Sequence, residues 1–218
     1  MSDIKIVTLT QPQSPAAEAY RALRMNLAFA SVDKELESLV VASPAPNEMK
    51  SLVAANLAVV MAQAEKQVVL VDGDLRRPHV HQLFDVAQEP GVTTLLLHQG
   101  EMADLPLLAT SVPGLRVLPS GTLPPNPADV LNSRKMEQLL ERLKDVADIV
   151  ICDAPPVTVA VDAAVLAART DGLLFVVRAG HTRRDRIEQA KEMLERFRVR
   201  LLGAVFTNAP EGGLLTAY

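Results

Sequence analysis

Apolar residues occur along the chain in two alternating patterns, short continuous runs and helix-spaced stretches. Continuous runs predict strands over 38–43, 68–71, 115–118, 148–153, 172–177 and 201–207. Helical spacing predicts helices over 15–30, 50–64, 91–100, 129–146, 161–169 and 183–198. We expect an extended arm over 1–14 and a proline-fixed loop over 121–127. Because strands alternate with helices throughout, the pattern predicts an α/β fold with one doubly wound, mostly parallel sheet and helices on both faces.

The segment VVASPAPNEMKSLVAANL, residues 40–57, places Lys50 and Ser51 between an apolar strand and a helix. A strand, a tight turn and Lys-Ser at the start of a helix are typical of a phosphate-binding loop, in which backbone N–H groups and the helix dipole face the anion. The pattern G-x-x-x-x-G-K-[ST] has glycine where this chain has Pro44 and Met49. From these residues alone, a phosphate loop and an ordinary strand-to-helix turn both remain open.

Three aspartates follow two of the predicted strands. Asp72 and Asp74 end the run VVLVDGD, and Asp153 ends the run DIVICD. The carboxyl ends of parallel strands form the edge at which α/β sheets bind ligands, so these carboxylates are candidates to face a cation or a reacting hydroxyl. A structural role, in which Asp72 and Asp74 cap the next segment, stays open. Arg76 and Arg77 follow directly and could bind phosphate or pair with acids.

A charged stripe marks the predicted helix 15–30. Glu18, Arg21 and Arg24 are spaced by three and therefore share one face of the helix. The pattern alone allows either a solvated face or a contact face for another subunit.

Composition narrows the possible classes of protein. The chain has 218 residues, 49% of them hydrophobic, which suits one domain over 1–218 with a sizeable core. A net charge of -4 and 3% aromatic residues give no sign of a nucleic-acid partner. The single Cys152 excludes a disulfide framework, and the four histidines follow no metal-binding spacing. With neither a signal-peptide pattern nor an apolar run long enough to span a bilayer, we expect a cytoplasmic protein.

Five segments together resemble a known family. In order they are EAYRALRMNL (18–27), VVLVDGDLRRP (68–78), LPSGTLPPNPADVL (118–131), DIVICDAPPV (148–157) and DGLLFVVRAGHT (171–182). This combination resembles the bacterial P-loop tyrosine kinases that govern capsule and exopolysaccharide export, over nearly the whole chain. The wider deviant-Walker, MinD-like class also holds ATPases that partition plasmids or place the division site. Those ATPases usually carry an extra lysine five residues before the lysine that corresponds to Lys50. This chain has Ala45 at that position, which favours the tyrosine-kinase branch.

The resemblance implies a set of residue roles toward ATP and Mg²⁺. Lys50 would bind the β- and γ-phosphates, and of Asp72 and Asp74 one would assist the metal while the other is a candidate base for the tyrosine hydroxyl. Asn208 resembles the residue that contacts adenine. The implied nucleotide loop comprises Pro46, Asn47, Glu48, Met49, Lys50, Ser51 and Leu52, and the implied metal residues are Ser51, Asp72 and Asp153.

The resemblance also implies partners. Glu18, Arg21 and Arg24 match the motif through which subunits pair in a ring, so 1–35 would supply an arm and a subunit-contact helix. A flexible tail, 210–218, would carry Tyr218 as the phosphoacceptor into a neighbouring subunit. A membrane-anchored modulator of the polysaccharide co-polymerase type would hold the chain at the inner face of the membrane.

Two departures from the family pattern keep other functions open. The loop has Asn47 and Met49 where glycines are usual, and a left-handed backbone at Met49 would cost on the order of 1–2 kcal/mol. The tail holds one tyrosine instead of a cluster. A catalytically impaired scaffold in polysaccharide export is therefore the alternative to an autokinase. A partitioning ATPase is a third candidate, disfavoured by the short tail and the net charge.

Overall fold

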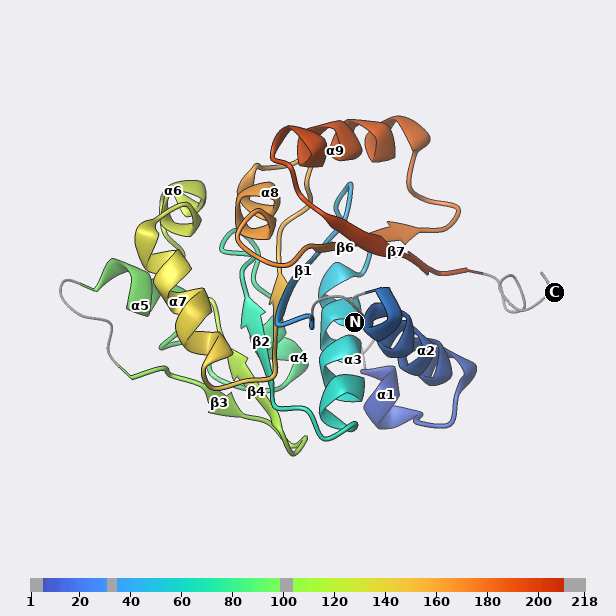
Figure 1. Ribbon diagram of the computed structural model, residues 1–218, viewed down its shortest axis with the longest axis horizontal. Helices are drawn as coiled ribbons and strands as arrows, with labels where there is room; N and C mark the ends of the chain where they lie inside the picture. Colours follow the sequence, from blue (N-terminus) through green and yellow to red (C-terminus); the bar gives the residue numbers. More distant parts are fainter. Residues whose placement is uncertain (1–5, 31–34, 99–103, 210–218) are drawn as a thin grey trace.

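The computed structural model describes residues 6–30, 35–98 and 104–209, which form a mixed sheet between two layers of helices (Figure 1). The strands are β1 (Ser38–Ala42), β2 (Val68–Asp72), β3 (Leu108–Ala109), β4 (Leu115–Leu118), β5 (Ile149–Asp153), β6 (Leu173–Arg178) and β7 (Leu201–Thr207). The helices are α1 (Val7–Thr10), α2 (Pro15–Ala30), α3 (Lys50–Ala62), α4 (Val80–Leu83), α5 (Val92–Leu97), α6 (Pro127–Leu131), α7 (Arg134–Lys144), α8 (Asp162–Ala167) and α9 (Arg184–Arg196).

The strand order in the described part of the chain is β3-β4-β2-β5-β1-β6-β7. All neighbouring pairs are parallel except β3 with β4 at one edge. This arrangement confirms the predicted doubly wound, mostly parallel sheet. It also makes β2 and β5 direct neighbours, with Asp72 paired in register with Asp153 at their carboxyl ends.

Both faces of the sheet are covered at β1, β2, β5 and β6, which explains why these strands are continuous apolar runs, whereas the edge strand β7 is mostly exposed. In β1, Leu39 and Val41 lie in the core cluster that also holds α3, while Val40 and Ala42 lie in the cluster that holds α7 and α8. Side chains therefore alternate between two cores, one under α1 to α4 and one under α5 to α9. This packing fixes the strand ends and so fixes the loops that follow them.

The predicted extended arm over 1–14 is wrong in its described part. Residues 7–10 form α1, which is held by Thr8: its backbone N–H and its hydroxyl both donate to Asn56 Oδ1, at 3.0 and 2.9 Å. Thr8 and Asn56 are both buried. A long-range side-chain contact thus fixes the structure of this segment, and no local pattern in the sequence predicted it.

The single helix predicted over 129–146 is also wrong, because the segment forms α6 and α7. Pro127 begins α6, where its fixed φ suits the first turn. Ser133 then caps α7: its Oγ accepts the N–H of Met136 at 3.3 Å. The short elements α4 and β3 were not predicted. No helix in the described ranges is long and apolar enough to cross a membrane.

Candidate functional site

The loop between β1 and α3 has the backbone of a phosphate cradle. Asn47 and Met49 have φ of 64° and 67°, in the left-handed region, and Met49 is the N-cap of α3. Such turns direct successive N–H groups toward one side, and the first N–H groups of a helix have no acceptor within the helix. Met49 therefore adopts the conformation that the pattern reserves for glycine, at a cost of about 1–2 kcal/mol. Its side chain is 43% exposed.

Contacts from neighbouring elements hold this strained loop. Thr158 Oγ1 donates to the carbonyl of Pro44 at 2.7 Å, and Thr207 Oγ1 donates to that of Glu48 at 3.2 Å. Arg178 Nη1 donates to the carbonyl of Asn47 at 3.3 Å. Since these donors come from three separate parts of the chain, the tertiary fold compensates for the missing glycine.

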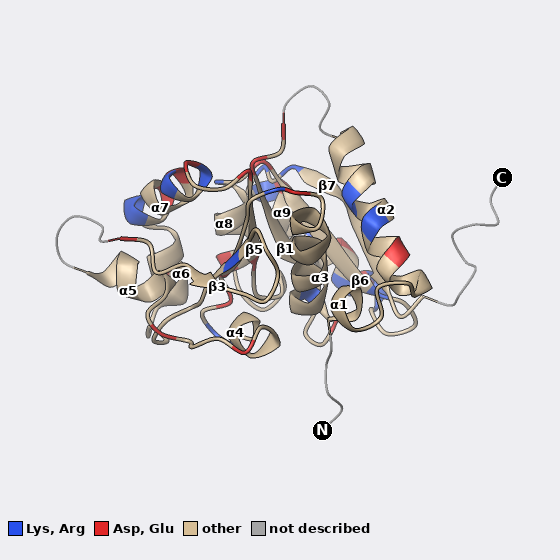
Figure 2. Ribbon diagram, turned by 90° about the horizontal axis from the view of Figure 1, so that it is seen from below, with Lys and Arg blue, Asp and Glu red and all other residues tan. Residues whose placement is uncertain are grey.

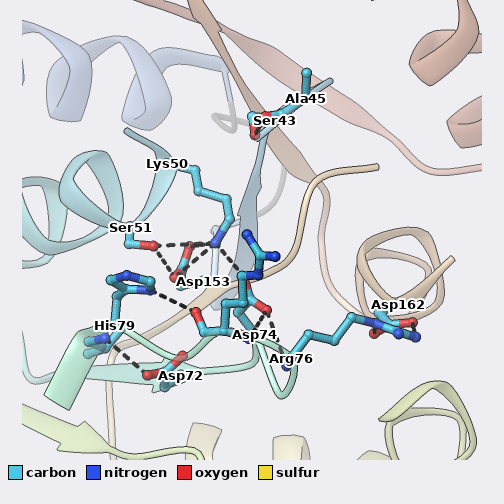
Figure 3. Close-up of polar contacts among 12 residues, drawn as sticks. Ser43, Ala45, Lys50, Ser51, Asp72, Asp74, Arg76, His79, Asp153 and Asp162 are labelled. Atoms are coloured by element: carbon cyan, nitrogen blue, oxygen red, sulfur yellow. Dashed lines mark hydrogen bonds and ion pairs between the residues drawn. The ribbon is translucent and has the colours of Figure 1, made fainter. Parts of the chain in front are cut away.

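Lys50 lies at the centre of the site (Figure 3). Its Nζ is 2.9 Å from Asp74 Oδ2 and 3.2 Å from Asp153 Oδ1, and its side chain is only 12% exposed. Burial disfavours the ammonium, but the charges of Asp153 and Asp74 outweigh that effect and raise the pKa of Lys50. The predicted convergence of the lysine with acids from neighbouring strands is present in the structure.

Asp153 joins the end of β5 to the start of α3. It is fully buried, and Ser51 Oγ donates to its Oδ2 at 2.5 Å. Burial raises the pKa of Asp153 to about 6: the charge of Lys50 offsets only part of the desolvation, and Asp72 and Asp74 repel the carboxylate further. An additional cation would therefore stabilise the charged form of this carboxyl group.

Asp72 has a free ligand atom. Its Oδ2 accepts the N–H of Val80 at 3.0 Å, whereas its Oδ1 is buried and has no hydrogen-bond partner among the described residues. With Ser51 and Asp153 it forms a set of hard oxygen donors, the kind that Mg²⁺ prefers. No group of three or more acidic, His or Cys side chains in the described ranges could hold a metal by itself. A magnesium ion here would therefore take most of its ligands from phosphate and water, as is usual for this ion.

Asp74 is oriented by the turn that follows it. Its Oδ1 accepts the N–H groups of Arg76 and Arg77, at 3.3 and 3.0 Å, and its Oδ2 faces Lys50. Gly73 makes this turn possible, because a Cβ there would lie 2.8 Å from the carbonyl oxygen of Asp153. The same backbone carbonyl accepts the N–H of Gly73 at 2.8 Å.

Sequence reasoning missed Asp162. This aspartate begins α8, is fully buried, and receives a two-pronged contact from the Arg76 guanidinium. The two residues are 86 positions apart, so only the possibility that Arg76 pairs with an acid could be stated from the sequence.

The Glu48 side chain lies beside the residues that end β6 and follow it. Its carboxylate is buried against the loop after β6, and neither oxygen makes a hydrogen bond of normal geometry within the described structure. Burial raises the pKa of Glu48, although the nearby Thr182 hydroxyl and the backbone N–H groups of Arg178 and Ala45 oppose the change. We infer that the backbone of Glu48, rather than its side chain, is available to a nucleotide.

The remaining predicted residues that the structure describes are not among the groups that contact Lys50. Asn208 directly follows Thr207, whose hydroxyl contacts Glu48 of the phosphate loop, and its Nδ2 is 3.5 Å from the carbonyl of Ala179. Arg21 Nη1 is 2.8 Å from Glu18 Oε2 on α2, both side chains are exposed, and Figure 2 marks the charged positions along this helix. Arg24 lies on the same helix. Tyr218 lies outside the described residues, and so does the predicted tail. The roles of all these residues stay predictions.

Comparison with known proteins places this site in a class. Residues 37–209 match the family model described as ParA, NUBPL iron-transfer P-loop NTPase. The fold and the site therefore define a P-loop NTPase, a nucleotide-binding class that works with a metal.

Individual relatives narrow the class further. Tyrosine-protein kinase YwqD of Bacillus subtilis (strain 168) is 40% identical over 200 residues, which cover 92% of this chain and 84% of the relative. The crystal structure of the chimeric protein CapA2B2 matches with a TM-score of 0.89 and 36% identity, over 94% of this chain and 90% of that one. The kinase domain of Escherichia coli tyrosine kinase ETK matches with a TM-score of 0.87 and 33% identity, over 100% of this chain and 85% of that one. The chain belongs to the family of bacterial tyrosine-protein kinases, as the resemblance implied.

Proposed function

We propose that this protein is a tyrosine autokinase that transfers the γ-phosphate of Mg-ATP to Tyr218 of a neighbouring copy and so regulates capsule or exopolysaccharide synthesis and export. The observation that supports the proposal most directly is the convergence of Lys50, Asp74 and Asp153 beside the phosphate loop. Family membership supports the reaction class.

The side chains of the site suit phosphoryl transfer, which depends on positioning and charge neutralisation. Lys50 and the N–H groups at the start of α3 would bind the phosphates. Ser51, Asp72 and Asp153 would hold Mg²⁺ directly or through water, and the ion would neutralise charge on the phosphates. Asp74, fixed by two backbone N–H groups, is the better placed of the two neighbouring acids to accept the tyrosine proton.

The choice of Tyr218 as acceptor is supported by the environment of Tyr20, the only other tyrosine in the sequence. Tyr20 lies on α2 and packs against the core, and burial raises the pKa of its hydroxyl to about 12. A half-buried phenol within a helix is a poor acceptor, because it cannot enter another subunit's site without unfolding.

The proposal includes partners. Glu18, Arg21 and Arg24 would pair subunits in a ring that presents Tyr218 to the next active site. A membrane-anchored modulator of the co-polymerase type would bring the kinase to the inner face of the membrane. The similarity to the chimeric CapA2B2 is consistent with such a partner. We propose no nucleic-acid partner, because the net charge is -4.

Incubation with labelled ATP and Mg²⁺ tests the reaction. We expect label on the wild type and on Tyr20→Phe, and none on Tyr218→Phe or on Asp74→Asn. To test transfer in trans, Lys50→Met carrying Tyr218 is mixed with active Tyr218→Phe; label should then appear on the Lys50 variant. Absence of label on the wild type would refute the proposal.

One observation favours the second candidate, a non-catalytic scaffold. Met49 occupies a left-handed position that glycine fills in the usual pattern, and this residue borders the phosphate site. Calorimetry with ADP and Mg²⁺ separates the two functions. Micromolar binding would count against the scaffold, and no binding at millimolar nucleotide would favour it.

A further inference from the structure

The loop after β2 is tied to α8 by one ion pair. Arg76 Nε is 2.8 Å from Asp162 Oδ2, and Arg76 Nη2 is 3.2 Å from Asp162 Oδ1. The Arg76 side chain is 40% exposed, but that of Asp162 is fully buried (Figure 3). Parallel two-point contacts of this kind fix the direction of both side chains, which a single point charge would not do.

This pair is continuous with the candidate catalytic groups. The backbone N–H groups of Arg76 and Arg77 hold Asp74 Oδ1, and Asp74 Oδ2 in turn lies 2.9 Å from Lys50 Nζ. A displacement of Arg76 would therefore move a donor to the carboxylate that faces the lysine. The contacts run from Asp162 through Arg76 to Asp74 without a gap.

The rest of the turn packs between β5 and α8, so it has little room to adopt another conformation. Leu75 is 1% exposed in the core. A Cβ on Gly73 would lie 3.1 Å from Leu166 Cδ2, so the turn touches α8 at a second point. Apolar contacts fix where the turn lies, but they do not set the direction of an N–H group. The buried acid supplies that directional constraint.

We propose that Asp162 is a positioning residue for phosphoryl transfer: through the guanidinium fork of Arg76 it holds the backbone N–H groups that orient Asp74 against Lys50. The inference rests on the proposed function. Asp162 itself contacts neither the phosphate loop nor the lysine in any described interaction, so its effect runs through Arg76.

Asp162→Asn tests this role, with Glu137→Gln as the matched control. Glu137 also accepts from an arginine Nε, that of Arg169 at 3.2 Å, but this pair lies away from the site. We expect Asp162→Asn to lower kcat for autophosphorylation at least tenfold while the Kd for ADP-Mg changes less than threefold. The control should leave both constants unchanged. An unchanged kcat, or a Kd that worsens as much as kcat falls, would overturn the inference.

A double variant tests the route. Arg76→Lys keeps the charge opposite Asp162 but loses the fork. If Asp162 acts only through Arg76, the double variant Arg76→Lys/Asp162→Asn is no slower than Asp162→Asn alone. If the two substitutions instead lower kcat by independent factors that multiply in the double variant, Asp162 does not act through Arg76 and the proposal is contradicted. If circular dichroism shows that Asp162→Asn does not fold, the kinetics of Arg76→Lys alone test the inference. We then expect kcat to fall at least tenfold while the Kd for ADP-Mg changes less than threefold.

Amide hydrogen exchange separates this inference from the proposed function, because it needs no activity. In Asp162→Asn, we expect exchange at Arg76 and Arg77 at least tenfold faster than in the wild type, and no such change in Glu137→Gln. A wild type that transfers no phosphate would overturn the proposed function. Amides that stay equally protected in Asp162→Asn would overturn this inference alone.

Discussion

Ser51 Oγ lies 2.5 Å from Asp153 Oδ2, so a hydrogen bond joins the first turn of α3 to the end of β5. The two residues are 102 positions apart: Asp153 ends β5, and Ser51 follows the loop after β1 in the same sheet. Lys50 contacts the same carboxylate. The loop that would bind phosphate and the aspartate that would bind the metal are therefore in direct contact. A substitution in either should change the position or the charge environment of the other.

Asp153 should make the stability of the protein depend on pH. Its pKa is raised from 3.8 to about 6, so between about pH 4 and 6 the folded state keeps a proton that the unfolded chain has released. The free-energy contribution of this group therefore falls as pH rises through that window. Asp153→Asn should gain stability relative to the wild type from pH 4 to 7, by up to about 3 kcal/mol.

Urea unfolding at a series of pH values measures this difference. Asp185→Asn is the control: the hydrogen bond from Arg183 lowers the pKa of Asp185, so this variant should not gain stability over the wild type as pH rises. A difference between Asp153→Asn and the wild type that stays constant with pH would contradict the assignment of the raised pKa.

Removing Lys50 should destabilise the protein in the absence of metal. Lys50→Met leaves Asp74 and Asp153 buried without their cation, which costs on the order of 3 kcal/mol. Added Mg²⁺ should recover part of the loss in Tm. Lys66→Met is the control, because its pair with Glu35 is exposed on both sides and is worth at most about 1 kcal/mol. Equal losses of Tm in the two variants would show that the buried ion pairs of Lys50 stabilise the protein no more than the exposed pair of Lys66 does.

Met49→Gly should improve nucleotide binding. Glycine adopts φ near 67° without strain and removes a side chain from the mouth of the loop, so we expect the Kd for ADP-Mg to fall several-fold. Glu65→Gly relieves a similar φ of 64° beyond the end of α3, away from the loop. Both variants should show similar small changes in Tm, but only Met49→Gly should change the Kd measured by calorimetry. A Kd unaffected by Met49→Gly would mean that the methionine does not obstruct the site.

Cys152 should be inert while the protein is folded. It is fully buried in β5, and burial, with a smaller contribution from Asp153, raises the pKa of its thiol to about 12. A thiol reagent such as DTNB should therefore react only at the rate of unfolding, and at once in denaturant. Rapid reaction with the native protein would place the thiol at an accessible surface instead.

Much of the fold follows from local pattern. The strands 115–118 and 201–207 and the helix 15–30 are found at their predicted bounds, although the strand 201–207 is mostly exposed at the edge of the sheet. The break between α6 and α7 was missed because helical spacing continues across it while Ser133 caps a new helix. The segment that forms α1 was missed because Thr8 depends on Asn56, a partner in another helix.

The candidate site, like the fold, could be predicted only in part from the sequence. Lys50, Asp72 and Asp153 could be predicted to meet, because each follows a parallel strand and such strands end at a common edge. The pairing of Arg76 with Asp162 could not, since nothing local links residues 86 positions apart. The raised pKa of Asp153 also needed the fold, because it comes from burial and from neighbouring charges.

The sequence by itself predicted the main strands and helices, the aspartates near the carboxyl ends of β2 and β5, and the position of Lys50 and Ser51 at the start of a helix. Periodicity and residue type are local properties, and local properties suffice for these. The tertiary structure alone decided that Met49 adopts a glycine-like conformation, that Asp72 keeps a free oxygen and that Asp162 supports the turn at Asp74. Each of these depends on which distant groups share a buried space, and only the packed chain fixes that.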